Sequence, residues 1–276
     1  MGTSYANKVG IKVVSPRWGL SKSEYFFDKE QRVISKGLSS VKYMSPAVAD
    51  ELYSLAHSRT FDSFIDVLKG ITEYTSIDSR QLDILIHIDF FSDFGNQNEL
   101  TVISNVFADL FKKGEARQIK RSLIDGTIYE VAVSSHATSK TKSGAEAKSY
   151  TLTDCDAAMH EAENAIRKME MKDACLRDKI QYQVDYFGHV ASTGNESDRA
   201  TLIVVGVYPL ERKRDGKQFG YSVITNSLGS GKQSRFTIFN RDWKRCGEIA
   251  KGDIIRCLDY KRDGEYFTMT DYMEMW

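Results

Sequence analysis

Several residue types and patterns that would narrow the fold are scarce in this sequence. It has three prolines in 276 residues, so long proline-rich linkers are absent. Its four cysteines form no CxxC pair and have no neighbouring histidine pair, which predicts neither a zinc site nor a disulfide framework: Cys155, Cys175, Cys246 and Cys257. No apolar run approaches the roughly 20 residues that span a bilayer, and the first ten residues lack the apolar stretch of a secretory signal. We therefore expect a cytoplasmic protein without a membrane partner.

The chain also lacks net charge, since 38 basic side chains balance 38 acidic ones. A protein that follows a phosphate backbone usually has a basic excess, so neutrality weighs against a nucleic-acid partner. The balance is, however, a cancellation between blocks. Residues 1–45 carry +5, 46–110 carry −8, 111–150 carry +4, 151–200 carry −4 and 201–276 carry +3. The question of a nucleic-acid partner therefore has to be asked block by block.

Hydrophobic periodicity and turn residues divide the chain into four expected parts: 1–36, 37–113, 114–198 and 199–276. The first is a small β-containing edge segment, with a short strand over 9–14 and a hairpin around 28–31. The second has helical spacing with serine, proline and glycine at the helix ends. This pattern predicts an all-helical module of short helices joined by tight turns.

The third part, 114–198, is a connecting segment with less regular patterning. Its expected pieces are a β-like stretch over 127–133, a polar mobile loop over 134–144, a helix from 153 or 154 to about 178, and a linker over 188–197.

The last part has the order of an OB-fold barrel. Five strands are expected at 201–210, 219–225, 234–239, 253–260 and 265–271, with a short helix over about 241–250 between the third and the fourth. Three strands, a helix and two strands are typical of the five-stranded OB barrel. The expected fold class is therefore α+β multidomain, with a helical module, a connecting segment and a C-terminal OB-fold β-barrel.

OB barrels bind single strands through aromatic side chains that stack on bases and basic side chains that follow the phosphates. The last part of the chain supplies both types. The expected nucleic-acid-binding residues are Arg212, Lys213, Arg214, Lys217, Tyr221, Arg235, Phe239, Lys261 and Tyr266. The alternative is structural, because strand alternation turns about half of the aromatic side chains toward the barrel core and a solvated basic hairpin is common.

Four runs appear in an order and spacing that resemble a known family: 10–14, 34–42, 61–64 and 85–95. They look like the C-terminal half of the bacterial DNA polymerase III alpha subunit, the family C replicative polymerase. The barrel segment, with Gly206 in its first strand and Lys251-Gly252-Asp253 before its fourth, is similar to the OB domain of that family. The resemblance covers most of the chain except roughly 115–180.

The resemblance implies the end of the fingers, a tandem helix-hairpin-helix region and an OB domain. In the family, polymerisation is carried by acidic residues of a palm domain that hold two magnesium ions. Those residues precede everything seen here, so we carry over no catalytic residue, no metal site and no cofactor.

The family also places a glycine in each hairpin, where backbone N–H groups approach a phosphate of duplex DNA. Here Ser45 stands at the expected glycine of the first hairpin and Asp89 at that of the second. A carboxylate at such a turn, within a block of −8, repels a phosphate. These departures weigh against duplex binding, and the alternative is that the helices serve as a packing scaffold between polymerase parts.

Other candidate sites have less support. The histidines are scattered and none has the spacing of a metal ligand: His57, His87, His136, His160 and His189. Residues 229–232 read Gly-Ser-Gly-Lys but lack the spacing and the strand-to-helix context of a phosphate loop.

Two functions are therefore expected as alternatives. In the first, the chain contributes single-stranded template binding to DNA replication as a non-catalytic part of a polymerase III alpha-like protein, beside the remainder of a polymerase or other replisome proteins. In the second, it is a stand-alone, polymerase-derived module that contacts replication proteins.

Overall fold

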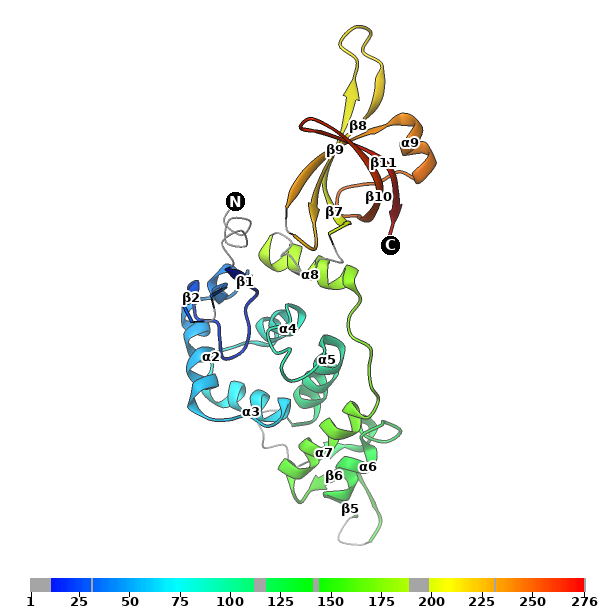
Figure 1. Ribbon diagram of the computed structural model, residues 1–276. Coiled ribbons are helices and arrows are strands. Elements are labelled where there is room, and N and C mark those ends of the chain that lie inside the picture. Colours follow the sequence, from blue (N-terminus) through cyan, green and yellow to red (C-terminus); the bar gives the residue numbers. More distant parts are fainter. Residues whose placement is uncertain are drawn as a thin grey trace. The chain divides into compact units, whose positions relative to one another are not determined.

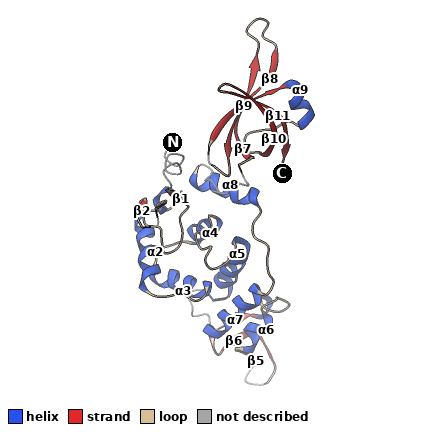
Figure 2. Cartoon of the chain, viewed as in Figure 1, coloured by secondary structure: helices blue, strands red, loops and turns tan. Residues whose placement is uncertain are grey.

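The structure of the protein, a computed structural model, describes residues 11–30, 32–111, 118–140, 144–188, 199–230 and 232–275 (Figure 1). The chain divides into two compact units: Val14–Tyr182 make one, and Gln183–Trp276 lie in the other. The first is mainly helical and the second contains a closed five-stranded β-barrel (Figure 2). The expected α+β class, with helical hairpins followed by an OB-like barrel, is confirmed. None of the helices in the described ranges is long and apolar enough to cross a membrane.

A small sheet opens the described chain, with strands β1 (Lys12–Val14), β2 (Phe26–Asp28) and β3 (Val33–Ser35). The order is β1-β3-β2, so β2 lies at one edge. Phe26 pairs with Ser35 and Phe27 with Ile34, so β2 and β3 form the hairpin expected around 28–31.

Four helices form the body of the first unit: α2 (Pro46–Ser58), α3 (Phe64–Tyr74), α4 (Ser79–His87) and α5 (Gln97–Val106). The 3-10 turn η1 (Leu38–Ser40) precedes them and the π-helical turn η2 (Phe107–Phe111) follows. Each helix begins after a residue whose side chain accepts a backbone N–H of the first turn: Ser45, Ser63, Asp78 and Asn96. The cap of α4 is Asp78, which directly precedes Ser79, the first residue of the helix.

The connecting segment folds onto these helices. It contains β4 (Gln118–Lys120), η4 (Arg121–Leu123), α6 (Glu130–Ser135), β5 (Ala137–Lys140), β6 (Glu146–Leu152), α7 (Cys155–Arg167) and α8 (Leu176–Phe187). Its three strands form a sheet in the order β4-β6-β5.

Two expectations for this segment are wrong in part. The β-like stretch over 127–133 ends in helix α6, because the Glu130 carboxylate accepts the Gly126 N–H at 2.7 Å while Ala132 and Val133 are buried where α6 packs on α7. The loop over 134–144 begins in the last turn of α6 and continues as β5; its residues 141–143 lie outside the described residues.

The helix expected over 154–178 is divided in two. Asp154 caps its start as predicted, but α7 ends at Arg167 and α8 begins at Leu176. Side chains at the start of α5 bind the backbone between α7 and α8. The Asn96 side chain, for example, donates to the Met171 carbonyl at 2.8 Å. Tertiary hydrogen bonds therefore replace the helical ones over this stretch. The linker expected over 188–197 lies, from residue 189 on, outside the described residues.

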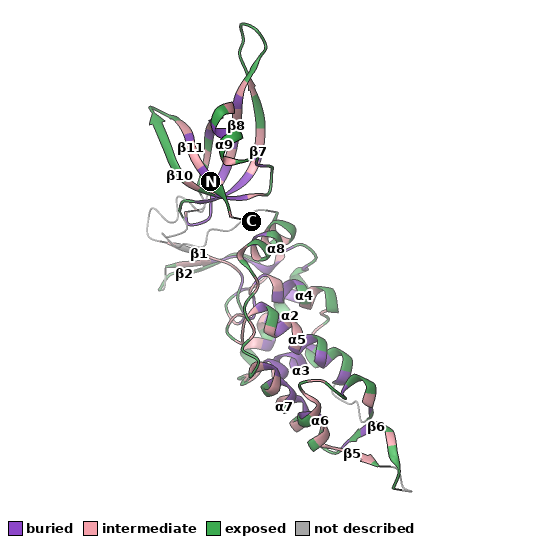
Figure 3. Ribbon diagram, turned by 90° about the vertical axis from the view of Figure 1, so that its right-hand side faces the viewer, coloured by how far each residue is buried: buried purple, intermediate pink, exposed green. Residues whose placement is uncertain are grey.

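The barrel consists of β7 (Thr201–Glu211), β8 (Gln218–Ser227), β9 (Gln233–Phe239), β10 (Ile254–Asp263) and β11 (Tyr266–Glu274), with α9 (Asn240–Cys246) between β9 and β10. The sheet order is β10-β11-β9-β8-β7, and β10 pairs with β7 to close it. Buried, intermediate and exposed residues are interspersed along the barrel strands (Figure 3), and on β9 the buried Phe236 and Ile238 flank the half-buried Thr237. The core residues include Val223, Phe236, Ile238, Ile255 and Met269.

Candidate nucleic-acid interface

The outer surface of the barrel displays part of the predicted binding set on neighbouring strands. On β9, Phe236 and Ile238 are buried in the core, so Arg235 and Phe239 point outward on the alternate positions. Arg235 is exposed, and Phe239 is 43% exposed. Both side chains are therefore accessible to a ligand on the outside of the barrel.

Strands β10 and β11 continue this surface. Thr268 of β11 pairs with Thr237 of β9 in the parallel register, and Lys261 of β10 pairs with Thr268. Directly paired residues share a face, so Lys261 lies on the same outer surface as Thr237. Tyr266, two residues before Thr268, shares its face and is 80% exposed.

Extending the register in the other direction adds a residue that sequence reasoning missed. Thr237 pairs with Ser222 of β8, and Ser222 pairs with Tyr208 of β7. Tyr208 is 54% exposed. A Cβ on Gly206 would lie 2.9 Å from the Tyr208 ring, so the glycine makes room for that ring. A glycine two residues before an aromatic residue in a strand was the signal available in the sequence.

Tyr221 differs from the other members of the predicted set. Its ring packs against the barrel core and stacks on Trp243 of α9, with ring centroids 3.8 Å apart. One face of the ring is therefore already covered by the indole.

The four remaining predicted residues lie together in the β7–β8 turn: Arg212, Lys213, Arg214 and Lys217. All four are exposed. The Arg212 N–H donates to the Lys217 carbonyl at 3.0 Å, and Gly216 occupies the left-handed conformation that closes the turn. Asp215 is 3.9 Å from the Arg212 guanidinium, so the turn keeps a basic excess.

In the first helical hairpin the residue in the left-handed conformation is Tyr43, with φ 69°, and not Ser45. Ser45 has extended backbone and caps α2 through a hydrogen bond from the Val48 N–H. The Tyr43 carbonyl accepts from the Gln81 side chain at 2.8 Å, and the Arg80 guanidinium lies 3.7 Å from the centre of the Tyr43 ring. The expectation that Ser45 occupies the glycine position is therefore wrong by two residues.

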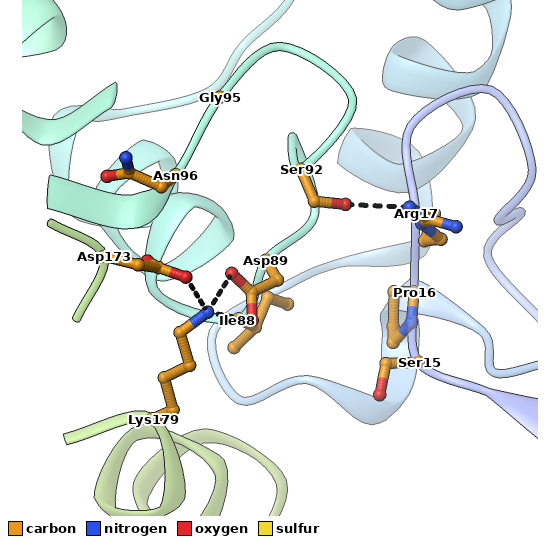
Figure 4. A pocket seen from close by; sticks show the side chains of 10 residues that line it. All are labelled: Ser15, Pro16, Arg17, Ile88, Asp89, Ser92, Gly95, Asn96, Asp173 and Lys179. Atoms are coloured by element: carbon orange, nitrogen blue, oxygen red, sulfur yellow. Dashed lines mark hydrogen bonds and ion pairs between the residues drawn. The ribbon is translucent and has the colours of Figure 1, made fainter. Parts of the chain in front are cut away.

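In the second hairpin Asp89 has φ 61°, a conformation that usually favours glycine. The Lys179 ammonium of α8 lies 3.2 Å from both Asp89 carboxylate oxygens and 2.6 Å from Asp173 (Figure 4). Burial opposes the charge of Lys179, but the hydrogen bond that it donates to Asp173 and the charge of the Asp89 carboxylate raise its pKa above the usual value. Burial alone raises the pKa of Asp173, yet the hydrogen bond and charge of Lys179 lower it overall.

These groups line a pocket of about 450 Å³ beside the start of α5 (Figure 4). Arg17 closes another side, where its guanidinium donates to Ser92 and Asp93 at 3.1 Å. The cations of the pocket are thus already bound to side chains of the same unit. The positive charges at the second hairpin are therefore neutralised by neighbouring carboxylates and attract an anion only weakly.

The residues that the structure describes contain no group of three or more histidine, cysteine, aspartate or glutamate side chains able to hold a metal ion.

Comparison with known proteins supports a nucleic-acid function. Residues 10–100 match the model of a protein family described as a helix-hairpin-helix motif, and this stretch contains both hairpins. No curated protein matches the chain. The motif match, together with a closed five-stranded barrel, indicates that the protein binds nucleic acid.

Proposed function

We propose that the barrel binds single-stranded DNA along its outer surface. The strand crosses Phe239, Arg235 and Tyr266, while the cationic β7–β8 turn closes over its phosphates. The observation that carries this proposal is the exposure of aromatic rings beside basic side chains on paired strands of one barrel surface. Stacked bases contribute on the order of 1–3 kcal/mol each, and phosphate contacts add a salt-dependent part.

The proposal extends to the role of the whole chain. The order of its motifs supports a DNA-binding C-terminal part of a DNA polymerase III alpha-like protein, which holds the template during DNA replication and has no catalytic residue of its own. The barrel, at +3, is the part suited to a single strand. The second hairpin, with Asp89 bound to Lys179, is unsuited to a duplex phosphate.

The alternative is a stand-alone module that contacts replication proteins through the same barrel surface. The altered hairpins favour it, because the left-handed positions of the two hairpins are occupied by Tyr43 and Asp89 and not by glycine. The two proposals differ in whether the barrel surface has intrinsic affinity for DNA.

Fluorescence anisotropy with a labelled single-stranded oligonucleotide tests the first proposal. We expect affinity at low salt that falls as salt rises, and the double variant Arg212→Ala/Arg214→Ala lowers both the affinity and the slope of log K against log salt, by about 0.7 for each lost phosphate contact. Tyr266→Ala lowers the affinity with little change in slope, because it removes stacking and no charge.

Lys251→Ala is the matched control, since Lys251 is an exposed cation in the turn before β10 and lies outside the proposed path. Absence of binding at low salt contradicts the proposal, as does an equal loss of slope in the control. Binding to purified replication proteins by a chain that binds no DNA would support the alternative.

A further inference from the structure

Three consecutive aromatic side chains at the start of the β2–β3 hairpin are exposed. Tyr25 is 58% exposed, Phe26 41% and Phe27 42%. Phe26 and Phe27 lie in β2, the edge strand, and Tyr25 directly precedes it. We call Tyr25–Phe27 the aromatic edge. Clustered apolar exposure of this kind marks an interaction site more often than single exposed residues do.

The exposure is imposed by the backbone. The Leu38 N–H donates to the Lys22 carbonyl at 2.9 Å, and the Ser39 N–H donates to the Ser23 carbonyl at 3.0 Å. A Cβ on Gly37 would lie 2.4 Å from the Ser23 oxygen, so only glycine permits this approach. The backbone just before the aromatic edge is thus fixed by its hydrogen bonds to residues 38 and 39, and β2 itself is fixed by its pairing with β3. The rings are preorganised, and ordering them costs little on binding.

The chemistry around the edge fits a single strand of nucleic acid. The Lys22 ammonium lies 4.9 Å from the centre of the Phe26 ring and 5.0 Å from that of Tyr53 in α2. Residues 11–45 contain seven lysine or arginine side chains and three acidic ones. Two copies of this segment repel each other, whereas a phosphate backbone is complementary to it.

The spacing of the rings also fits bases. Tyr25 directly precedes β2, and Phe27 is the second residue of that strand. Residues two apart along extended backbone share a face and are separated by about 6.8 Å. That separation is twice the roughly 3.4 Å rise of successive bases. One base therefore fits between the two rings, or each ring receives one base on its outer side.

We propose that the aromatic edge is a second contact for single-stranded nucleic acid, which stacks bases on Tyr25 and Phe27 within the basic segment 11–45. This contact uses residues of the helical unit and none of the residues of the proposed barrel surface. It does not require the barrel proposal to hold.

Photocrosslinking of the full chain tests the contact. An oligonucleotide that carries 5-iodouracil is irradiated with the protein, and the linked peptide is mapped by mass spectrometry. We expect crosslinks within residues 25–27, and the double variant Tyr25→Ala/Phe27→Ala lowers the crosslink yield and the affinity at least about five-fold, the low end of the loss of one stacked base. Tyr25→Phe/Phe27→Tyr retains both, because it keeps the rings.

Tyr74→Ala is the control, since Tyr74 is 56% exposed at the end of α3 and lies in the acidic block. The same measurements are repeated on Tyr266→Ala, which separates the two contacts. Loss in the edge variant with an unaffected Tyr266 variant supports the edge and contradicts the barrel surface, and the reverse result overturns the edge. Unchanged crosslinking and affinity in a folded edge variant also overturn it. So does loss of self-association by sedimentation with unchanged affinity, which would assign the edge to a second copy.

Discussion

Asp89→Gly tests whether the carboxylate of the second hairpin keeps duplex DNA away. Two effects on stability oppose each other. The left-handed conformation costs an L-residue roughly 1–2 kcal/mol, and less for aspartate, so glycine relieves strain at φ 61°. The variant also loses the contact with Lys179, but Asp89 is 40% exposed, and an exposed ion pair contributes about 0.2–1 kcal/mol. We therefore expect a change in the free energy of unfolding within about 1 kcal/mol.

The effect on binding is read from the salt dependence of the affinity. Glycine lets backbone N–H groups of the turn approach a phosphate, and the repelling charge is gone. One new phosphate contact steepens the slope of log K against log salt by about 0.9 for duplex DNA. Lys179 keeps its partner Asp173 at 2.6 Å, so α8 stays attached to the hairpin region. Anisotropy with a labelled duplex between about 50 and 200 mM salt measures the slope.

Asp89→Asn serves as the comparison, because asparagine removes the charge and still tolerates the left-handed conformation. Equal gains in both variants assign the effect to charge, and a larger gain in the glycine variant assigns it to close approach of the backbone. If the glycine variant folds as stably as the parent and the slope for duplex DNA stays the same, the hairpin is no latent phosphate site and the reasoning fails.

Three further predictions concern the helical unit. Gly37→Ala forces the backbone away from the Ser23 carbonyl, 2.4 Å from the new Cβ, so thermal unfolding should occur at a clearly lower temperature; an unchanged midpoint contradicts this close approach. Glu163→Ala leaves two buried N–H groups at the start of α3 without an acceptor and should cost about 3–5 kcal/mol in urea unfolding, with a smaller cost for Glu163→Gln. Burial opposes the charge of His160, but the hydrogen bond to the Asp156 backbone carbonyl and the Asp66 carboxylate raise its pKa. The stability that His160 contributes is therefore complete below about pH 6.5 and is lost as the pH rises through its pKa in the folded state. His160→Gln should flatten that part of the curve of unfolding free energy against pH.

Local signals account for much of the fold. Capping side chains mark the helix starts locally, as at Ser45 and Ser63, because a cap acts over three residues of chain. The barrel was also predictable from alternation, since one face of each strand fills a small closed core. In β8, Tyr221 is two residues before the core residue Val223, so strand alternation already indicated that Tyr221 points inward.

The rest depends on contacts distant in sequence. The division between α7 and α8 follows from hydrogen bonds to the start of α5, and no local residue between 168 and 175 requires it. The Asp89–Lys179 pair joins positions 90 residues apart. Tyr208 joins the outer surface only through a register that crosses β8, β9 and β11. Periodicity cannot provide such pairings, so the members of the candidate interface were predictable by residue type and not by position.

The acidic block shows why a charge count must be read with the structure. Three carboxylates of residues 46–110 bind cations of α7 and α8: Asp66 with His160 at 3.1 Å, Asp89 with Lys179 at 3.2 Å and Glu99 with Arg167 at 3.4 Å. Part of the acidity of this block therefore stabilises the contact between the connecting segment and the helices. The basic turn of the barrel is exposed and available to a phosphate. Removing carboxylates in the helical unit should thus change its stability and leave single-strand affinity unaltered. Removing cations from the β7–β8 turn should lower single-strand affinity and leave the stability unaltered.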